Sequence, residues 1–322
     1  MAKERKVPVS KDRDKHLCPD NNENNLDKWA YEMVEMQEKK ERVYHYTSMD
    51  TFFKIVEGAK DDFFVFRAGS LYTMNDSQEM LIGYEYIKKY LPDVEKELGV
   101  CDEDKIFNMT KNLKTNKNIK ENYGSWVKND DTTNFIVSFS QKPDILPMWA
   151  LYGDKGRGVC LEFSPYIIKE FYKDKLIDKN LQIESCRYNE KDIEDFVLRN
   201  MRIVYRLFLS QNDKEKRNNP YTKATYLTTM CCIIGAYVKH PSFEYEKEVR
   251  MNIFKNIKDW KFDDTEYHRC YTEIPIPLTA LKGVIVGPAA NIYDFKNSII
   301  LRLRTKGISL EPIHSKIPFR LL

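Results

Sequence analysis

The chain has 322 residues, of which 42% are hydrophobic and 31% are charged, so we expect a soluble globular protein with one large domain or two small ones. Its net charge is only +3, and the overall charge balance therefore singles out neither nucleic acid nor an anionic membrane as the partner. The seven cysteines show no C-x-x-C spacing and no stretch is apolar enough to span a bilayer, which favours a cytoplasmic protein without a disulfide framework.

The N-terminal part of the chain carries few apolar residues. Residues 1–25 are polar, rich in Asn and free of aromatic side chains, which predicts a flexible arm. A helix is expected to follow at 26–43, and then a strand at 43–47 in which His45 and Tyr46 face opposite sides. The next short helix, at 48–58, has Ser48 as a candidate N-cap and a glycine at its end.

The rest of the chain alternates between strand and helix patterns. Strands are expected at 62–69, 133–140, 158–164, 243–254, 272–277, 281–287 and near 309–314, and helices at 75–91, 143–153 and 293–307. Two long helical stretches, 190–211 and 221–239, predict a helical insertion at about 189–238. This order predicts an α+β fold in which residues 26–322 form one domain, with a split, mostly antiparallel sheet and flanking helices.

His45 is one of only five histidines, and it lies between two tyrosines. The structural interpretation is a strand histidine packed under a helix, with one ring nitrogen bonded to the backbone. A metal site is not indicated, because the other histidines do not combine with cysteines or with each other at a zinc-ligand spacing.

The segment "MNDSQEM" allows two interpretations. Asp76 and Glu79, three residues apart before an apolar run, have the spacing of a capping box at a helix N-terminus. The functional alternative places Asn75 and Asp76 at the rim of a cleft.

The segment "SFSQKPDILPMWALYG" combines two hydroxyl groups with two aromatic rings. Ser138 and Ser140 point to the same face of a strand, and Trp149 and Tyr152 are spaced to share a helix face. Aromatic side chains here could belong to the core, but a planar ring bearing an amide would need this combination of stacking surface and hydroxyl groups.

The run "FEYEKEVRM" is unusually acidic for a strand. In a regular strand Glu244, Glu246, Glu248 and Arg250 would share one face. One interpretation is the solvated face of an edge strand. The other is a site where carboxylates meet a developing positive charge while Arg250 holds them in place. The pattern of a metal-dependent nuclease fails, because a tyrosine and not an acid stands two residues before Lys247.

Taken in order, the motifs "YHYTS", "LYTMNDSQE", "SFSQKPDILPMWALYG…GVCLEF", "YEKEVR" and "LKGVIVG" resemble an uncharacterised bacterial family, a domain of unknown function of about this length, over roughly residues 42–315. More distantly, the order resembles the ADP-ribosyltransferase fold of the diphtheria-toxin and poly(ADP-ribose) polymerase type. Those enzymes carry a histidine on an early strand, a strand with small hydroxyl residues before a helix with a tyrosine, and a glutamate on a late strand.

The distant resemblance implies NAD as the substrate and no metal. It implies an NAD-binding set of His45, Tyr46, Ser138, Ser140, Trp149 and Tyr152. Glu248 would be the catalytic acid, with Glu246 beside it in an E-x-E arrangement, and either of the two could be the catalytic one. Trp149 departs from the polymerase type, in which small residues are common at this place, and its ring would narrow the nicotinamide pocket.

The function expected from this resemblance is an NAD-dependent ADP-ribosyltransferase, or another NAD-consuming effector of toxin or antiviral type. Its acceptor would be protein, nucleic acid or water, and an antidote or sensor protein would be a further partner. One alternative is a non-catalytic nucleotide- or nucleic-acid-binding module that uses the basic residues 3–15 and the Lys/Asn-rich residues 105–128. Another is a protein-interaction module that docks through the helical insertion.

Overall fold

The structure, a computed structural model, describes residues 40–71, 80–110, 132–175, 181–264 and 269–319. The arm predicted at 1–25, nearly all of the helix predicted at 26–43, and the cleft candidates Asn75 and Asp76 lie outside the described residues. So do residues 111–128 of the Lys/Asn-rich stretch. By its internal contacts the chain from Glu41 to Leu322 forms one unit.

Ten strands of the described part of the chain form one open sheet. They are β1 (Val43–Thr47), β2 (Phe63–Ser70), β3 (Thr132–Ser140), β4 (Val159–Phe163), β5 (Gln182–Ser185), β6 (Glu248–Asn256), β7 (Lys261–Phe262), β8 (Cys270–Pro277), β9 (Leu281–Val286) and β10 (Ile313–His314). Their order is β10-β9-β4-β1-β3-β2-β8-β7, and β6 pairs with both β3 and β5. All these pairs are antiparallel except β9 with β10. The predicted α+β class with a mostly antiparallel sheet is confirmed.

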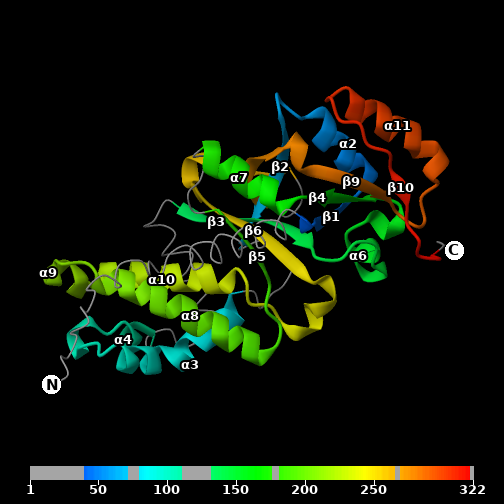
Figure 1. Ribbon diagram of the computed structural model, residues 1–322. Coiled ribbons are helices and arrows are strands. Elements are labelled where there is room, and N and C mark those ends of the chain that lie inside the picture. Colours follow the sequence, from blue (N-terminus) through cyan, green and yellow to red (C-terminus); the bar gives the residue numbers. More distant parts are fainter. Residues whose placement is uncertain (1–39, 72–79, 111–131, 176–180, 265–268, 320–322) are drawn as a thin grey trace, which may run out of the picture. The chain divides into compact units, whose positions relative to one another are not determined.

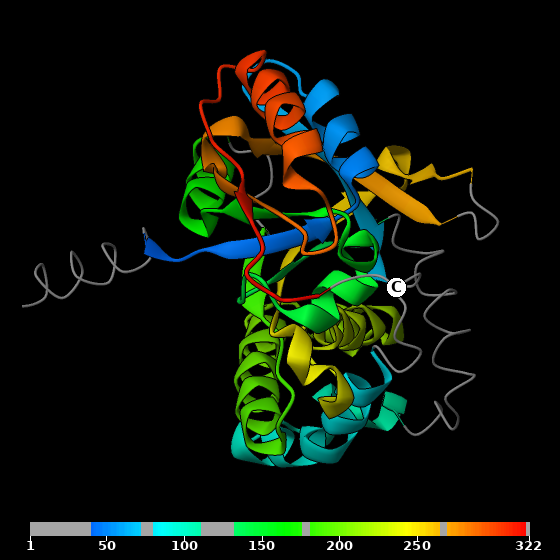
Figure 2. The ribbon, with the colours of Figure 1, turned by 90° about the vertical axis from the view of Figure 1, so that its right-hand side faces the viewer.

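Helices cover the sheet on both sides (Figure 1), and the two larger hydrophobic cores lie between these helices and the sheet. The helices are α2 (Met49–Glu57), α3 (Leu81–Glu97), α4 (Phe107–Thr110), α6 (Leu146–Leu151), α7 (Pro165–Lys175), α8 (Glu190–Leu209), α9 (Lys214–Asn218), α10 (Pro220–Gly235) and α11 (Ile292–Arg304). The helices α2, α7 and α11 pack on one face, and α3, α8 and α10 form a bundle on the other, as the turned view also shows (Figure 2). No described helix is long and apolar enough to cross a membrane.

The alternation of β3 explains how one strand serves both cores. Phe135, Val137 and Phe139 belong to the core under α2, α7 and α11. Ile136, which points to the opposite face, belongs to the core of the helical bundle. The bundle helices α8, α9 and α10 fall inside the range where the sequence predicts a helical insertion, and α3 joins them from an earlier part of the chain.

The sheet is split along one edge of β3. On its other edge, β3 pairs with β6 over its whole length, from Thr132 opposite Asn256 to Ser140 opposite Glu248. On the split edge, β1 is opposite only Ser140, and β2 is opposite only Phe135 and Ile136. On this split edge, residues 137–139 have no described strand beside them, because β1 and β2 diverge there. This divergence creates the space in which the candidate site lies.

The strand predicted at 243–254 is shorter than expected. Pro241–Glu246 form a 3-10 turn, Lys247 has a left-handed backbone (φ 43°), and β6 begins only at Glu248. The proline starts the turn, and the His240 ring accepts a hydrogen bond from the backbone N–H of Ser242. The prediction that Glu244 and Glu246 extend the strand face of Glu248 is therefore wrong.

Candidate functional site

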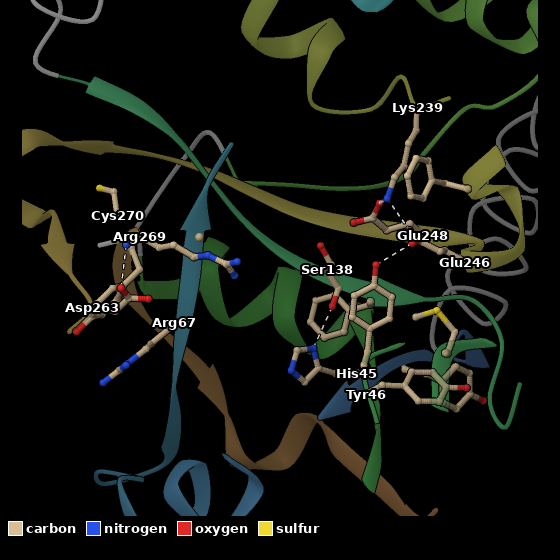
Figure 3. Close-up of a pocket in the computed structure, with 17 residues that line it drawn as sticks. His45, Tyr46, Arg67, Ser138, Lys239, Glu246, Glu248, Asp263, Arg269 and Cys270 are labelled. Atoms are coloured by element: carbon tan, nitrogen blue, oxygen red, sulfur yellow. Dashed lines mark hydrogen bonds and ion pairs between the residues drawn. The ribbon is translucent and has the colours of Figure 1, made fainter. Parts of the chain in front are cut away.

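A cavity of about 390 Å³ opens where β1 and β2 diverge (Figure 3). The residues that line it come from β1, β2, β3, α6 and its C-cap, the segment 239–246, the start of β6 and the β7–β8 hairpin. They are Tyr44, His45, Tyr46, Arg67, Gly69, Ser138, Phe139, Met148, Tyr152, Lys239, Phe243, Glu246, Glu248, Asp263, Arg269, Cys270 and Tyr271. The volume is within the usual range for small-molecule sites.

His45 closes the gap in the sheet with its side chain. Its Nδ1 atom is 3.0 Å from the backbone oxygen of Ser138, which lies on the split edge of β3, and the ring stands edge-on to Phe66 and Phe139. A carbonyl oxygen only accepts hydrogen bonds, so Nδ1 carries the hydrogen and Nε2 of the neutral ring is an acceptor. His45 thus makes the hydrogen bond to the backbone that is expected of a structural histidine in a strand, and it also lines the cavity.

The protonation of His45 follows from its surroundings. Burial lowers its pKa, and the hydrogen bond to the carbonyl of Ser138 opposes this only in part. The ring is therefore neutral at pH 7. A neutral ring with a free Nε2 lone pair can accept a hydrogen bond from a ligand hydroxyl group.

Tyr46 and Trp149 support the loop before α6. The Tyr46 hydroxyl donates to the carbonyl of Lys142 at 3.2 Å and accepts from the N–H of Ile145 at 3.1 Å. Its ring stands edge-on to Trp149 at 4.9 Å, and the Trp149 indole donates to Asp144 at 2.8 Å. Trp149 is completely buried and lies outside the set of residues that line the cavity. Its ring therefore does not narrow the cavity.

Tyr152 is separated from Trp149 by the end of the helix. Helix α6 ends at Leu151, and Tyr152 follows as its C-cap residue, with its N–H still donating to the Met148 oxygen at 2.9 Å. The two rings nevertheless differ in burial, because Trp149 is completely buried and Tyr152 is 37% exposed. Tyr152 lines the cavity, and its hydroxyl donates to Glu246 at 2.8 Å.

The two serines of β3 have different surroundings. Ser138 lines the cavity, whereas Ser140 is completely buried and lies outside the lining set. The Ser140 hydroxyl donates to the backbone oxygen of Glu246 at 2.7 Å and accepts from the N–H of Lys142 at 3.1 Å. Ser140 thus fixes the backbone that presents Glu246.

Four buried charged side chains lie together at one end of the cavity, and we call them the carboxylate cluster: Lys239, Glu246, Glu248 and Arg250. All of them except Arg250 line the cavity. The Lys239 ammonium is 2.5 Å from Glu246 and 2.9 Å from Glu248, and Arg250 Nε is 2.9 Å from the second oxygen of Glu248. Arg250 also donates to the backbone oxygen of Ala236 at 2.9 Å. Two negative charges are thus matched by two positive ones.

The position of β6 explains why the cluster is buried. Glu246, Glu248 and Arg250 are 2%, 4% and 0% exposed, because β6 lies between β3 and β5 and not at an edge of the sheet. The interpretation of this run as the solvated face of an edge strand is therefore wrong. Arg250 does hold Glu248, as the alternative interpretation expects.

Charge pairing overcomes the cost of burial in this cluster. Burial alone would raise the pKa of Glu248, but the guanidinium of Arg250 and the ammonium of Lys239 hold it at about 2. Burial alone would lower the pKa of Lys239, but the carboxylates of Glu248 and Glu246 raise it above its usual value. Glu248 is therefore ionised, and Lys239 protonated, throughout the neutral range.

Several residues of the cavity are missing from the sequence prediction. The most important is Lys239, which follows the apolar helix α10; a lysine is rarely buried unless it is paired, and nothing local indicates its partners. Tyr188, which lies outside the lining residues but whose hydroxyl accepts from the N–H of Glu248 at 2.9 Å, is also missing from it. Arg67 and Arg269 at the opposite end of the cavity are also absent from the prediction. Within the described ranges, no group of three or more His, Cys, Asp or Glu residues is arranged to hold a metal ion.

Residues 148–251 match the family described as "Protein of unknown function (DUF2971)". This span contains Tyr152 and the whole carboxylate cluster, but not His45. No curated protein and no solved structure matches the chain. The predicted resemblance to an uncharacterised family is confirmed over these residues, while the resemblance to ADP-ribosyltransferases stays a prediction.

Proposed function

We propose that the chain is an NAD-consuming enzyme of the ADP-ribosyltransferase type. One observation carries the proposal. His45, Tyr152 and Glu248 come from three distant parts of the sequence, and all three line the cavity at the split of the sheet. These are the residue types and the order along the chain that the distant resemblance implies for binding and cleaving NAD.

The chemistry of this cleavage suits the ionisation of the side chains. When the bond between nicotinamide and ribose breaks, the electron pair leaves with the nicotinamide and positive charge develops on the ribose. A fixed carboxylate stabilises that charge without a metal ion. Because its pKa is held at about 2, Glu248 carries its negative charge at every physiological pH.

His45 and Tyr152 would each contact a different part of the substrate. The free Nε2 of His45 would accept a hydrogen bond from a ribose hydroxyl group, since Nδ1 is committed to the backbone of Ser138. Tyr152 is 37% exposed, and its ring offers a stacking surface for the nicotinamide, while its hydroxyl is committed to Glu246. The acceptor of the ADP-ribose would be protein, nucleic acid or water.

A second candidate function is nucleotide binding without catalysis. The charge balance of the carboxylate cluster favours it, because Lys239 and Arg250 already neutralise the two glutamates. A positive charge on the substrate would gain less from a carboxylate that is already paired. The two candidates differ in turnover, not in NAD binding.

The test combines calorimetric titration of NAD with chromatographic detection of released nicotinamide. We expect His45→Ala to weaken NAD binding, and Glu248→Gln to keep binding while lowering turnover by about a hundred- to a thousand-fold. Glu246→Gln run in parallel decides which carboxylate is catalytic. The control is Glu244→Gln, four residues before Glu248 on the exposed turn, which should leave turnover unchanged.

The outcomes separate the two candidates. Saturable NAD binding without turnover in the wild type would leave the non-catalytic function. Full turnover in both Glu248→Gln and Glu246→Gln would refute the catalytic assignment, provided that both variants unfold cooperatively on heating. No binding up to about millimolar NAD would refute both functions, since substrate constants seldom exceed that range.

A further inference from the structure

The end of the cavity opposite the carboxylate cluster carries two arginines. Arg67 lies on β2, and Arg269 lies directly before β8, on the far side of the cavity from Lys239 and Glu248 (Figure 3). Asp263 is the single acidic residue among the lining residues at this end. Its carboxylate accepts from the backbone N–H of Arg269 at 2.8 Å and so helps to close the β7–β8 hairpin.

The Arg67 side chain is held in a defined position. Its guanidinium carbon is 4.6 Å from the centre of the Tyr271 ring. A guanidinium that stacks by its face keeps its N–H donors free along its edge, where they can form paired bonds to phosphate oxygens. Stacking thus prepares Arg67 for an anion without using its donors.

No described carboxylate pairs with Arg67. Glu273 is opposite Arg67 in the β2–β8 ladder, but its carboxylate pairs with Lys261 at 2.7 Å. Unlike Arg67, each cation of the carboxylate cluster has an acidic partner among the described residues. Two arginines and one carboxylate, Asp263, line the end that contains Arg67, so positive charge is in excess there, whereas the carboxylate cluster is charge-matched.

Gly69 leaves open space beside these arginines. It is two residues after Arg67 on β2 and thus on the same face of the strand, and it lines the cavity. A Cβ atom added to Gly69 would meet no other atom within 4 Å. The absent side chain leaves room for a ligand to lie against the backbone of β2.

We infer that Arg67, Arg269 and Gly69 form a phosphate-binding subsite, and that the substrate of this cavity is therefore a nucleotide with a diphosphate group and not a free nucleoside. The inference rests on the proposed function, because it places the diphosphate of NAD at this end when the nicotinamide lies at Tyr152. Arg67 and Arg269 contact the phosphate oxygens, and the backbone at Gly69 forms the floor of the subsite against which the diphosphate lies.

The test titrates four probes by calorimetry: NAD, ADP-ribose, inorganic pyrophosphate and nicotinamide riboside, which has no phosphate. Arg67→Gln and Arg269→Gln should each weaken the binding of NAD and ADP-ribose by about ten- to a hundred-fold, the scale of one charge-assisted contact. They should change the binding of nicotinamide riboside less than about two-fold. Added salt should weaken binding of the phosphate-bearing probes more steeply.

Two further variants make the test specific. Gly69→Leu keeps both arginines and fills the floor, so it should also weaken ADP-ribose binding. Arg304→Gln, on the exposed end of α11 and outside the lining residues, removes an equal charge and should have no effect.

The outcomes distinguish this inference from the proposed function. If ADP-ribose or pyrophosphate binds and loses affinity in the arginine variants while NAD is neither bound nor cleaved, the subsite stands and the NAD function fails. If NAD binds equally well to the wild type and to both arginine variants, the subsite is refuted and the NAD function stands. If none of the four probes binds at about millimolar concentration, the subsite is refuted as well.

Discussion

Replacement of Lys239 by Met should destabilise the protein strongly and in a pH-dependent way. The Lys239 ammonium contacts two carboxylates at 2.5 and 2.9 Å, and the three side chains are only 3–6% exposed. Methionine keeps the length and apolar stem of the side chain, so the loss is mainly one of charge. Removing one partner of a buried ion pair costs about 3–5 kcal/mol, because it leaves an uncompensated charge inside the protein. We expect the free energy of unfolding at pH 7 to fall by that amount.

The same loss should become smaller in acid. In the wild type the pKa of Glu248 is held at about 2, against 4.5 for an unperturbed glutamate, so this carboxylate stabilises the fold above pH 4.5. That stabilisation disappears as the pH falls from 4.5 toward 2. Lys239 is one of the two cations that lower the pKa of Glu248. The difference in unfolding free energy between wild type and Lys239→Met should therefore narrow between pH 5 and pH 3.

Urea unfolding followed by circular dichroism at pH 7, 5 and 3.5 measures this difference. The matched control is Lys54→Met, because Lys54 is equally close to a carboxylate, 2.7 Å from Asp50, but both side chains are more than 70% exposed. Its effect should be much smaller at all three pH values. If Lys239→Met costs no more than this control, or if its cost is the same at all three pH values, the buried ion-pair reasoning is wrong.

Three further predictions follow from the same structure. The lowered pKa of Glu248 corresponds to about 3 kcal/mol of stability, which the wild type should lose as the pH falls from 4.5 toward 2. Glu248→Gln should lack this loss when the free energy of unfolding is measured across the same pH range. Burial lowers the pKa of His45 below 6.5, so the free energy of unfolding should fall as the pH drops below 6.5, and His45→Gln should make this pH dependence weaker. NMR of the wild-type ring should show the Nδ1-protonated form at pH 7. Gly158→Ala should lower the free energy of unfolding in urea by about 2–4 kcal/mol, because the added Cβ would lie 2.1 Å from the Thr47 backbone oxygen. Gly69→Ala is the control and should be close to neutral, since the space around Gly69 is open. Equal losses in the two variants would contradict the packing argument.

Much of the fold follows from local patterns. The strand around His45 and the helix after it are where alternation and capping place them, and the Ser48 hydroxyl accepts from the N–H of Thr51 at 3.1 Å as an N-cap does. The helix α7 and the strand β5 are not predicted, and the acidic run is a third exception. A period of two continues through residues 243–247, but the proline-led turn and the left-handed Lys247 interrupt the strand, and alternation of residue types carries no information about either.

The candidate site was predictable in part. His45, Tyr152, Glu246 and Glu248 reach one cavity, as the resemblance implies. Ser140 and Trp149 do not, because a hydroxyl or a ring in the right segment can equally support the loop behind the site. Whether a ring on a short helix enters the cavity or the core behind it depends on tertiary packing, which a pattern of residue types does not determine.

Lys239 shows where local reasoning must fail. It lies seven and nine residues before its two partners, and a turn folds it back onto them, so no helix or strand spacing relates the three. The same segment ties the helical insertion to the sheet. Arg250 of β6 donates to the carbonyl of Ala236 at the end of α10, and Arg187, just before α8, exchanges backbone hydrogen bonds with Tyr237 and Lys239. The two ends of the insertion therefore meet at the carboxylate cluster, and the charges of the site and the packing of the bundle stabilise each other.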